Sequence, residues 1–290
     1  MTQTREPGLE GRLRQHVEKL AGEIGVRNVF RPQALHACEK YIRDVWTGQG
    51  YDVTNQEYSV AGVRSTNLEI SLPGKSDGDI VVVGAHYDTV SGSPGADDNA
   101  SGIAVLLELG RLLKTPRRPK TRLRLTAFVN EEPPFFFTSR QGSRVYAKAL
   151  RARGERIRMM LALEMLGFYS DTIGSQHYPP VFRWFYPDRG NFIALVSDLR
   201  SRREMRRFAC AFKSASDFPL EHAATFFWVP GVAWSDHLSF WREGYRAMML
   251  TDTAFFRNPN YHATTDTPDT LDYVRMAVLA EGLAATLEQL

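Results

Sequence analysis

The feature that most constrains the fold is a short, fully apolar, β-branched run at residues 80–83 (IVVV). Such a run predicts a strand that is covered on both faces, as in the parallel sheets of α/β proteins. Helical patterns alternate with further predicted strands at residues 51–60, 66–72, 123–129, 159–165 and 247–250. Strands that alternate with helices pair in parallel through right-handed crossovers. The sequence therefore predicts an α/β fold with a mostly parallel sheet.

Apolar residues at helical spacing predict helices at residues 13–24, 38–46, 103–113 and 139–151. A last helix is signalled by Thr267 as its N-cap and by Pro268 at its first helical position. Between residues 168 and 229 the pattern weakens, because prolines and glycines interrupt aromatic and basic stretches. We expect this segment to elaborate a single domain of residues 1–290, and not to form a second one.

The charge balance, 36 basic against 33 acidic residues, gives a net charge of +3. This value gives no reason to expect a nucleic-acid partner or a membrane partner, and arginines within residues 200–207 are interpreted as a solvated helix face. Two cysteines are too few for a disulfide framework. The N-terminus lacks the apolar stretch of a secretory signal, and no run has the length of a membrane span. A cytoplasmic protein is expected, or a secreted one if a leader has been removed.

Two candidate site residues follow the apolar run directly. His86 and Asp88 stand at the carboxyl end of the predicted strand, where open α/β sheets place their sites. The imidazole is a candidate metal ligand and Asp88 a candidate orienter, since a ligating histidine gives its second ring N–H to an acceptor. Residues 95–102 (GADDNASG) then bring Asp97 and Asp98 in front of a helix. Helix capping needs only one such residue, so the acidic pair favours a bound cation.

More acidic residues end later strands. Glu131 and Glu132 follow one predicted strand, Glu164 ends the next, and His262 lies in a loop after the last. Adjacent carboxylates on an extended chain point to opposite sides, so one can hold a metal while its neighbour handles protons. Mixed histidine and carboxylate ligands suit zinc, with Co²⁺ or Mn²⁺ as substitutes. Five candidate ligands exceed what one catalytic zinc uses, which implies two ions.

His237, in the stretch 235–237 (SDH), is either a further site residue or part of a capped helix start. We favour a structural or supporting role, because the ligand set is full without it. Aromatic residues near the predicted loops suggest an apolar side-chain pocket, although such residues more often belong to the core. The candidate substrate-binding residues are Phe135, Tyr169, Tyr261 and His237.

The ordered motifs together resemble the co-catalytic dizinc exopeptidases of metallopeptidase family 28, which include aminopeptidases, glutamate carboxypeptidases and glutaminyl cyclases. Each motif alone is weak, but the ordered set is highly specific and extends from about residue 81 to the C-terminus. The resemblance implies a three-layer α/β/α sandwich with a mixed, mostly parallel central sheet, the zinc-exopeptidase or phosphorylase-like fold. The motifs are residues 84–88 (GAHYD), 94–102 (PGADDNASG), 130–134 (NEEPP), 142–143 (GS), 235–237 (SDH) and 261–266 (YHATTD).

Carried onto this sequence, the resemblance implies that Asp97 bridges two zinc ions and that the peptide bond from Asp97 to Asp98 is cis. It also implies that Glu131 is the general base and acid, and that Asp88 orients the first histidine. Many family members carry aspartate in place of the second strand-end glutamate, a difference that bears on how the substrate amine is placed. The remaining implied ligands are Glu132 and His262 for one ion, and His86 and Glu164 for the other.

The implied activity is that of an aminopeptidase, in which metal-activated water and Glu131 hydrolyse the first peptide bond of a peptide with a free N-terminus. An alternative on the same scaffold is a glutaminyl-peptide cyclotransferase with a single zinc. Those cyclases tend to carry tryptophan where Tyr261 stands. A further alternative is an inactive, metal-free relative that acts as a binding module, although every ligand position is filled. The oligomeric state is left open.

Overall fold

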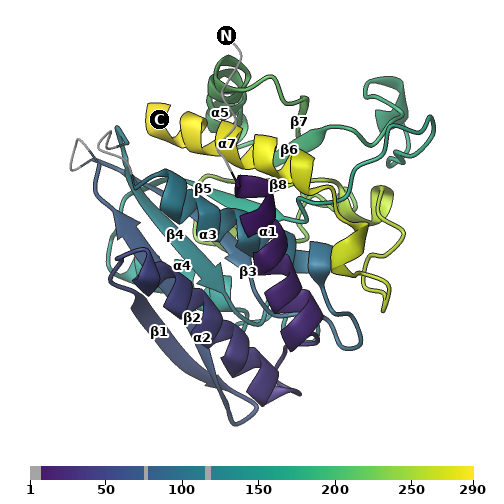
Figure 1. The fold of residues 1–290 in the computed structure, drawn as a ribbon. Coiled ribbons are helices and arrows are strands. Elements are labelled where there is room, and N and C mark those ends of the chain that lie inside the picture. The colour runs from purple at the N-terminus through teal and green to yellow at the C-terminus, as the bar shows by residue number, and fades with distance from the viewer. Residues whose placement is uncertain (1–7, 75–77, 115–118) are drawn as a thin grey trace.

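The computed structural model describes residues 8–74, 78–114 and 119–290, so residues 1–7 lie outside it. Within the described residues lies one mixed sheet of eight strands in the order β1-β2-β4-β3-β5-β8-β6-β7 (Figure 1). The strands are β1 (Thr54–Val60), β2 (Val63–Leu72), β3 (Ile80–His86), β4 (Arg122–Phe128), β5 (Ile157–Glu164), β6 (Ile193–Asp198), β7 (Leu220–Thr225) and β8 (Ala247–Thr251).

A parallel block forms the centre of this sheet. Strands β4, β3, β5 and β8 run parallel to one another in that spatial order. At one side, β1 and β2 form an antiparallel hairpin that joins β4. At the other side, β6 pairs antiparallel with β8 and parallel with β7. These pairings confirm the expected mixed, mostly parallel sheet.

Helices cover both faces of the sheet (Figure 1). They are α1 (Leu9–Val17), α2 (Pro32–Gly48), α3 (Gly102–Leu112), α4 (Gly142–Ala152), α5 (Arg202–Ala215), α6 (His237–Arg242) and α7 (Tyr273–Gln289). Helices α1, α2, α3, α5 and α7 pack on one face, and α4 and α6 on the other, which gives the predicted three-layer α/β/α sandwich. None of the described helices is long and apolar enough to cross a membrane.

Strand β3 shows why an uninterrupted apolar run is needed at the centre. All seven of its residues are buried. Val81 and Val83 belong to the large core cluster that includes side chains of α3 and α7, whereas Ile80 and Val82 belong to a second cluster with side chains of α4 and α6. Successive side chains of a strand project to opposite faces. A strand between two helical layers therefore needs apolar residues at every position.

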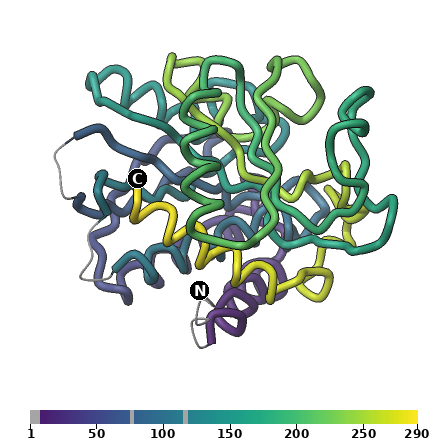
Figure 2. The backbone as a smooth tube through the Cα atoms, turned by 90° about the horizontal axis from the view of Figure 1, so that it is seen from above, coloured from purple at the N-terminus to yellow at the C-terminus, as the bar shows by residue number. Residues whose placement is uncertain are grey.

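Segment 168–229 contributes β6 and β7 to the same sheet and α5 to the helices that pack on it. Its loops near residues 170–190 project from the body in the view from above (Figure 2). The start of the last helix differs from the sequence prediction. Helix α7 begins at Tyr273, not at Pro268, because Leu271 and Asp272 have non-helical backbone dihedral angles. Thr267 and Pro268 instead begin a separate 3₁₀ helix, Pro268–Thr270. The N-cap of α7 is Asp272, whose side chain accepts a hydrogen bond from the backbone N–H of Arg275.

Candidate metal centre

The candidate residues meet at one edge of the sheet. His86 is the last residue of β3, Glu164 is the last residue of β5, and Glu131 and Glu132 follow β4. These three strands are parallel neighbours, so their carboxyl ends lie side by side. His262 reaches the same place from the loop between β8 and α7, in a left-handed conformation with a φ of 57°. Open α/β sheets place their sites at this edge.

Asp98 stands between the two histidines. Its Oδ1 lies 3.3 Å from Nε2 of His86, and its Oδ2 lies 3.2 Å from Nε2 of His262. His86 Nε2 is also 3.3 Å from Oε1 of Glu164, and His262 Nε2 is 3.4 Å from Oε2 of Glu132. Donor atoms of His86, Glu131 and Glu132 lie within 4.8 Å of one another. Two further groups of the same kind are His86, Asp98 and Glu164, and Asp98, Glu132 and His262. They share one carboxylate whose two oxygens face different histidines.

The structure corrects the prediction for Asp97. Its carboxylate is not among these donor atoms; it accepts hydrogen bonds from the backbone N–H of Gly167 at 2.9 Å and from the side-chain amide of Asn258 at 2.7 Å. The cis peptide bond joins Asp98 to Asn99, one residue later than expected. The backbone leaves helical dihedral angles at these two residues, so successive carboxylates point in different directions. The position between the histidines therefore belongs to Asp98.

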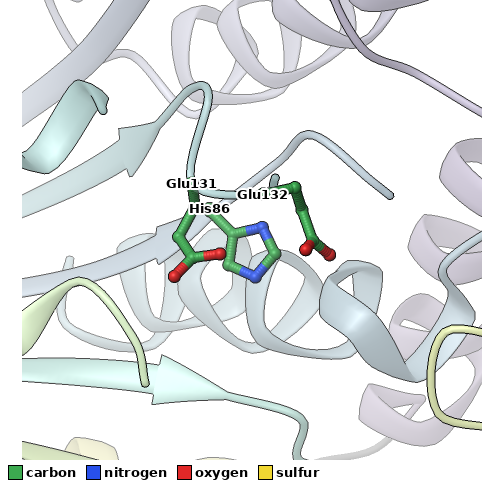
Figure 3. A group of neighbouring side chains, drawn as sticks. All are labelled: His86, Glu131 and Glu132. Carbon is green, nitrogen blue, oxygen red and sulfur yellow. The ribbon is translucent and has the colours of Figure 1, made fainter. Parts of the chain in front are cut away.

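Glu131 and Glu132 diverge, as neighbours on an extended chain do. Their carboxylates lie on opposite sides of the His86 ring in Figure 3. The backbone N–H of Glu131 donates to Oδ1 of Asp88 at 3.0 Å, and that of Glu132 donates to Oδ2 at 3.1 Å. Glu132 thereby joins the donor group of His262, whereas Glu131 stays beside His86 and outside both groups that contain Asp98.

Asp88 contacts His86 more closely through its backbone than through its carboxylate. Nδ1 of His86 lies 3.2 Å from the backbone carbonyl oxygen of Asp88, but 3.7 Å from its carboxylate. The carboxylate instead holds the two glutamate amides. Asp266 repeats this arrangement, because its Oδ1 accepts from the backbone N–H of Asp97 at 2.8 Å and its Oδ2 from that of Asp98 at 3.1 Å. The loop with Glu131 and Glu132 and the loop with Asp97 and Asp98 are thus each held by one buried carboxylate, which accepts hydrogen bonds from two successive backbone N–H groups.

Burial and crowding shift the pKa of these groups. Burial is the main cause of the raised pKa of Glu131, and burial with the charge of Asp98 raises the pKa of Glu132 to about 7. Burial alone would lower the pKa of both histidines, but the surrounding carboxylates raise that of His86 well above its usual value and that of His262 to about 10. Buried negative charge therefore exceeds buried positive charge, and a cation would relieve the excess.

The donor set fits divalent metal ions. Two buried carboxylate oxygens are poorly partnered: Oε1 of Glu132 has no hydrogen-bond donor among the described residues, and Oδ1 of Asp98 has only the ion-pair contact with His86 at 3.3 Å. Burying a carboxylate oxygen without a partner is costly. Imidazole and carboxylate donors together suit zinc. The two oxygens therefore favour a cation between these groups.

Two residues of the site received no role from the sequence. Ser235 donates its hydroxyl to Oε2 of Glu164 at 2.6 Å, which holds that carboxylate in one orientation. Asp236 is buried, with its Oδ1 3.4 Å from the side-chain amide of Gln141, and burial raises its pKa to about 7. The signal that could have found them is the stretch 235–237, in which both residues directly precede the candidate histidine.

Arg27 joins the N-terminal region to the loops around the site. Its side chain is fully buried although it carries a permanent charge. Its guanidinium donates hydrogen bonds to five backbone carbonyl oxygens, those of Leu20, Gly25, Tyr87, Pro94 and Gly95. One side chain therefore anchors both ends of the loop that runs from β3 to Asp97. No sequence pattern points to this residue.

A pocket with a volume of about 130 Å³ adjoins the metal centre. Glu164 lines it, and so does Tyr261, which stacks on His262 with ring centroids 3.9 Å apart. Tyr261 is thus the one predicted substrate-binding residue that the structure brings to the pocket. Side chains of β8, β6 and β7 form the floor, and aromatic residues form the walls, among them Tyr178, Phe182, Tyr186, Trp234 and Phe255.

The other three predicted substrate-binding residues are not part of this lining. Phe135 is buried within the core. Tyr169 packs against the same core and donates its hydroxyl to the carbonyl oxygen of Leu166. His237 is fully buried, with Nε2 2.8 Å from the carbonyl oxygen of Val232. Their burial agrees with the structural role that the sequence analysis favoured for His237, and with the general tendency of aromatic side chains near a site to belong to the core.

Sequence comparison places the chain among peptidases. Residues 67–287 match the family model described as Peptidase family M28. An Escherichia coli (strain K12) protein named "Uncharacterized protein YfbL" is 39% identical over 284 residues, which cover 95% of this chain and 86% of that protein. A "Probable leucine aminopeptidase" of Trichophyton verrucosum (strain HKI 0517) is 27% identical over 72% of this chain. The aligned part covers 53% of that relative, so the chain spans about half its length.

Solved structures share the fold. A zinc aminopeptidase from Bacillus subtilis, BSAP, superposes with a TM-score of 0.74 at 16% identity, covering 97% of this chain and 95% of that one. A Fimbriiglobus ruber glutaminyl cyclase gives a TM-score of 0.71 at 20% identity, covering 98% and 96%. At such identities the likeness shows the fold alone.

Proposed function

Since the chain belongs to peptidase family M28, we propose that it is a zinc-dependent aminopeptidase that hydrolyses the N-terminal peptide bond of short peptides. The observation that carries the proposal is the carboxylate of Asp98, which two groups of histidine and carboxylate donors share. Paired metal ions at a few ångströms are typical of aminopeptidases, and a shared carboxylate is what holds such a pair. We propose both that two zinc ions bind and that the cleaved bond is the one at the free N-terminus of the substrate.

Five residues would hold the ions. His86 and Glu164 would bind one, Glu132 and His262 the other, and Asp98 both. When bound, zinc supplies Lewis acidity and lowers the pKa of a coordinated water toward neutrality. The chain's own contribution is orientation, because Ser235 holds Glu164 and buried carboxylates hold the amides of both acidic loops. Such outer contacts keep ligands in place.

Glu131 is the proposed general base and acid. Its carboxylate lies beside His86 but outside the two donor groups that share Asp98 (Figure 3). Burial raises its pKa above the usual range of a glutamate, the direction in which enzymes shift carboxyl groups that serve as general bases and acids. It would accept the proton of the attacking water and pass it to the leaving amine. General acid–base catalysis of this kind contributes about 10²–10⁴-fold.

The adjoining pocket would receive the first side chain of the substrate. Glu164 belongs both to the proposed ligands and to the pocket lining, and Tyr261 of the lining stacks on the proposed ligand His262. A substrate held by the ions could therefore project its first side chain into the pocket. Its walls are mainly aromatic and its floor is largely aliphatic. Apolar walls with a few polar groups are typical of small-ligand sites.

The variant Glu131→Gln tests this proposal. We expect wild type and variant to bind about two zinc ions per chain by elemental analysis, with kcat on leucyl p-nitroanilide reduced about 10²–10⁴-fold in the variant. The control is Glu57→Gln, which removes an exposed glutamate on β1. A variant that keeps both its zinc and its rate would rule out Glu131 as the base. Equal cleavage of N-acetylated substrates would rule out an aminopeptidase.

Glutaminyl cyclisation is the second candidate, favoured by the shared fold with the Fimbriiglobus ruber cyclase. Incubation with a peptide that begins with glutamine separates the two reactions by mass spectrometry. Ring closure releases ammonia and leaves the chain length unchanged, whereas a peptidase releases free glutamine. A cyclised product without shortening would replace the peptidase proposal. Absence of bound zinc, with no activity after zinc is added, would instead favour an inactive binding module.

A further inference from the structure

Four residues on neighbouring strands form a row across the pocket floor. Glu164 of β5 pairs in register with Thr251 of β8. Thr251 pairs with Ala194 of β6, which pairs with Glu221 of β7. Residues in register project to the same face, and all four line the pocket. Adjacent strands lie about 4.8 Å apart, so the two glutamates are about 14 Å apart along this row.

Glu221 faces the pocket and not the core. The preceding residue, Leu220, is buried in the core on the helix-covered face. Since side chains alternate along a strand, Glu221 projects to the opposite face, where the pocket lies. No hydrogen bond or ion pair joins its half-buried carboxylate to another described residue. The pocket thus has a carboxylate at each end, and the distant one has no partner among the residues that the structure describes.

Aromatic rings surround this distant end. Tyr186 stacks between Phe182, with ring centroids 6.1 Å apart, and Tyr178, with centroids 6.0 Å apart. The pKa of both tyrosines is raised, first by burial and in part by the charge of Glu221, which therefore lies close to them. Aromatic faces attract cations, and methylene chains pack well along them. An aromatic channel that ends in a carboxylate is suited to a long, positively charged side chain.

We propose that Glu221 is a specificity-determining residue that selects substrates whose N-terminal residue is lysine or arginine. The inference rests on the proposed aminopeptidase function, because it needs the substrate's α-amine near Glu164. The methylene stem would lie on the apolar floor formed by Val196 and Met249. The cation at its end would bind the carboxylate of Glu221.

The dimensions agree with this placement. An extended lysine side chain spans about 6 Å from Cα to Nζ, given C–C bonds near 1.5 Å in a zigzag. Hydrogen bonds of about 3 Å at the α-amine and at the side-chain cation add most of the remaining distance to the separation of about 14 Å. A leucine side chain is too short to reach Glu221. Norleucine has the stem of lysine but no charge for the carboxylate to bind.

The experiment compares lysyl and norleucyl p-nitroanilides with the zinc-loaded protein. We expect kcat/KM to favour lysine about tenfold in wild type, the scale of one charge-assisted hydrogen bond to a half-exposed carboxylate. Glu221→Gln should remove this preference, so that the ratio of kcat/KM for the lysyl and norleucyl substrates falls to about one. The matched control is Asp217→Asn, which makes the same change in charge at an exposed residue just before β7. It should keep the preference.

The outcomes separate this inference from the proposed function. If norleucyl substrate is cleaved but Glu221→Gln leaves the lysine-to-norleucine ratio unchanged, the selectivity inference is overturned and the aminopeptidase proposal stands. If neither anilide is cleaved, the aminopeptidase proposal fails, and calorimetric titration with lysinamide and norleucinamide decides about Glu221. Tighter binding of lysinamide that is lost in Glu221→Gln supports the subsite, and equal binding of the two amides overturns it.

Discussion

The metal centre and the adjoining pocket are built in opposite ways. In the metal centre, buried carboxylates bind backbone amides in pairs, as Asp88 and Asp266 do, and these hydrogen bonds fix direction as well as distance. In the pocket, ring contacts dominate the walls, and Trp234 is 46% exposed. Ring contacts are less directional than hydrogen bonds. The side chains of the candidate metal centre are therefore held at defined positions, whereas side chains that line the pocket can be substituted without disturbing the fold.

This difference separates two tasks within one sheet. Strands β3, β4 and β5 end in the proposed ligands, whereas β6 and β7 supply part of the pocket floor and no proposed ligand. Substitutions in the first region should act on zinc binding and on kcat. Those in the second should act on the choice of substrate. The following predictions test whether the boundary between the two regions is as sharp as the contacts indicate.

The largest effect is expected at the shared carboxylate. Asp98→Asn should abolish measurable activity and reduce bound zinc to one ion per chain or fewer, because a neutral amide cannot offset two cations. The matched variant is Asp97→Asn, which changes a buried neighbour bound to Gly167 and Asn258 and should keep its zinc. Elemental analysis of both proteins decides. Zinc retained in Asp98→Asn and lost in Asp97→Asn would restore the bridging role to Asp97.

A smaller effect is expected at Asp266, which holds the backbone beside a proposed ligand and is not itself a proposed ligand. Asp266→Ala leaves the buried backbone N–H groups of Asp97 and Asp98 without their acceptor. Zinc affinity, measured by competition with a chromogenic chelator, should fall about 10–100-fold, as for other residues that position a ligand. Asp269→Ala, at an exposed position three residues later, serves as control. Unchanged affinity would show that the loop keeps its shape without this carboxylate.

In the pocket, Trp234→Ala should act on substrate binding alone. Trp234 lines the pocket and packs on Phe255, with ring centroids 5.4 Å apart. We expect kcat/KM on leucyl p-nitroanilide to fall about tenfold, the scale of removing one apolar group from a binding pocket. The change should lie mainly in KM, with zinc content unaltered. A fall in kcat or in bound zinc would break the separation between the two regions.

The smallest effect is expected away from both regions, at Glu108 on α3. Burial alone would raise its pKa, but hydrogen bonds from His16, Arg111 and Arg12 lower it to about 2. A depressed pKa of a carboxyl stabilises the folded state above the unfolded pKa near 4.3, and that stability is lost as pH falls toward 2. Glu108→Gln should cost about 1 kcal/mol at pH 7 after screening. Urea unfolding should show this difference shrinking below about pH 4, with activity unaffected.

Local patterns predicted which residues meet at the candidate metal centre, because the ends of buried strands determine its position. The apolar run in β3 predicted where His86 would stand, and Glu164 followed from the same reasoning applied to β5. The choice between Asp97 and Asp98 was not predictable in this way. It depends on the non-helical backbone at Asp98 and Asn99, which no periodicity reveals.

The pocket was less predictable, because pairing between distant strands creates it. Residues 220–225 (LEHAAT) carry little of the β-branched or aromatic character of a strand, and they form β7 because β6 is available beside them. The alignment of Glu221 with Glu164 passes through three strand pairings. This row depends on the order of the strands within the sheet. The sequence alone did not determine that order for the strands that follow β5.

Arg27 bears on where the unit that contains the site begins. The family match starts at residue 67, yet the guanidinium at residue 27 anchors the loop after β3 and the turn before Asp97. A fragment cut at the edge of the family match would keep every proposed ligand and the whole parallel block of the sheet. It would lose the cation that holds both ends of the loop between two proposed ligands, His86 and Asp98. A domain boundary drawn at the start of the family match would thus begin too late in this protein.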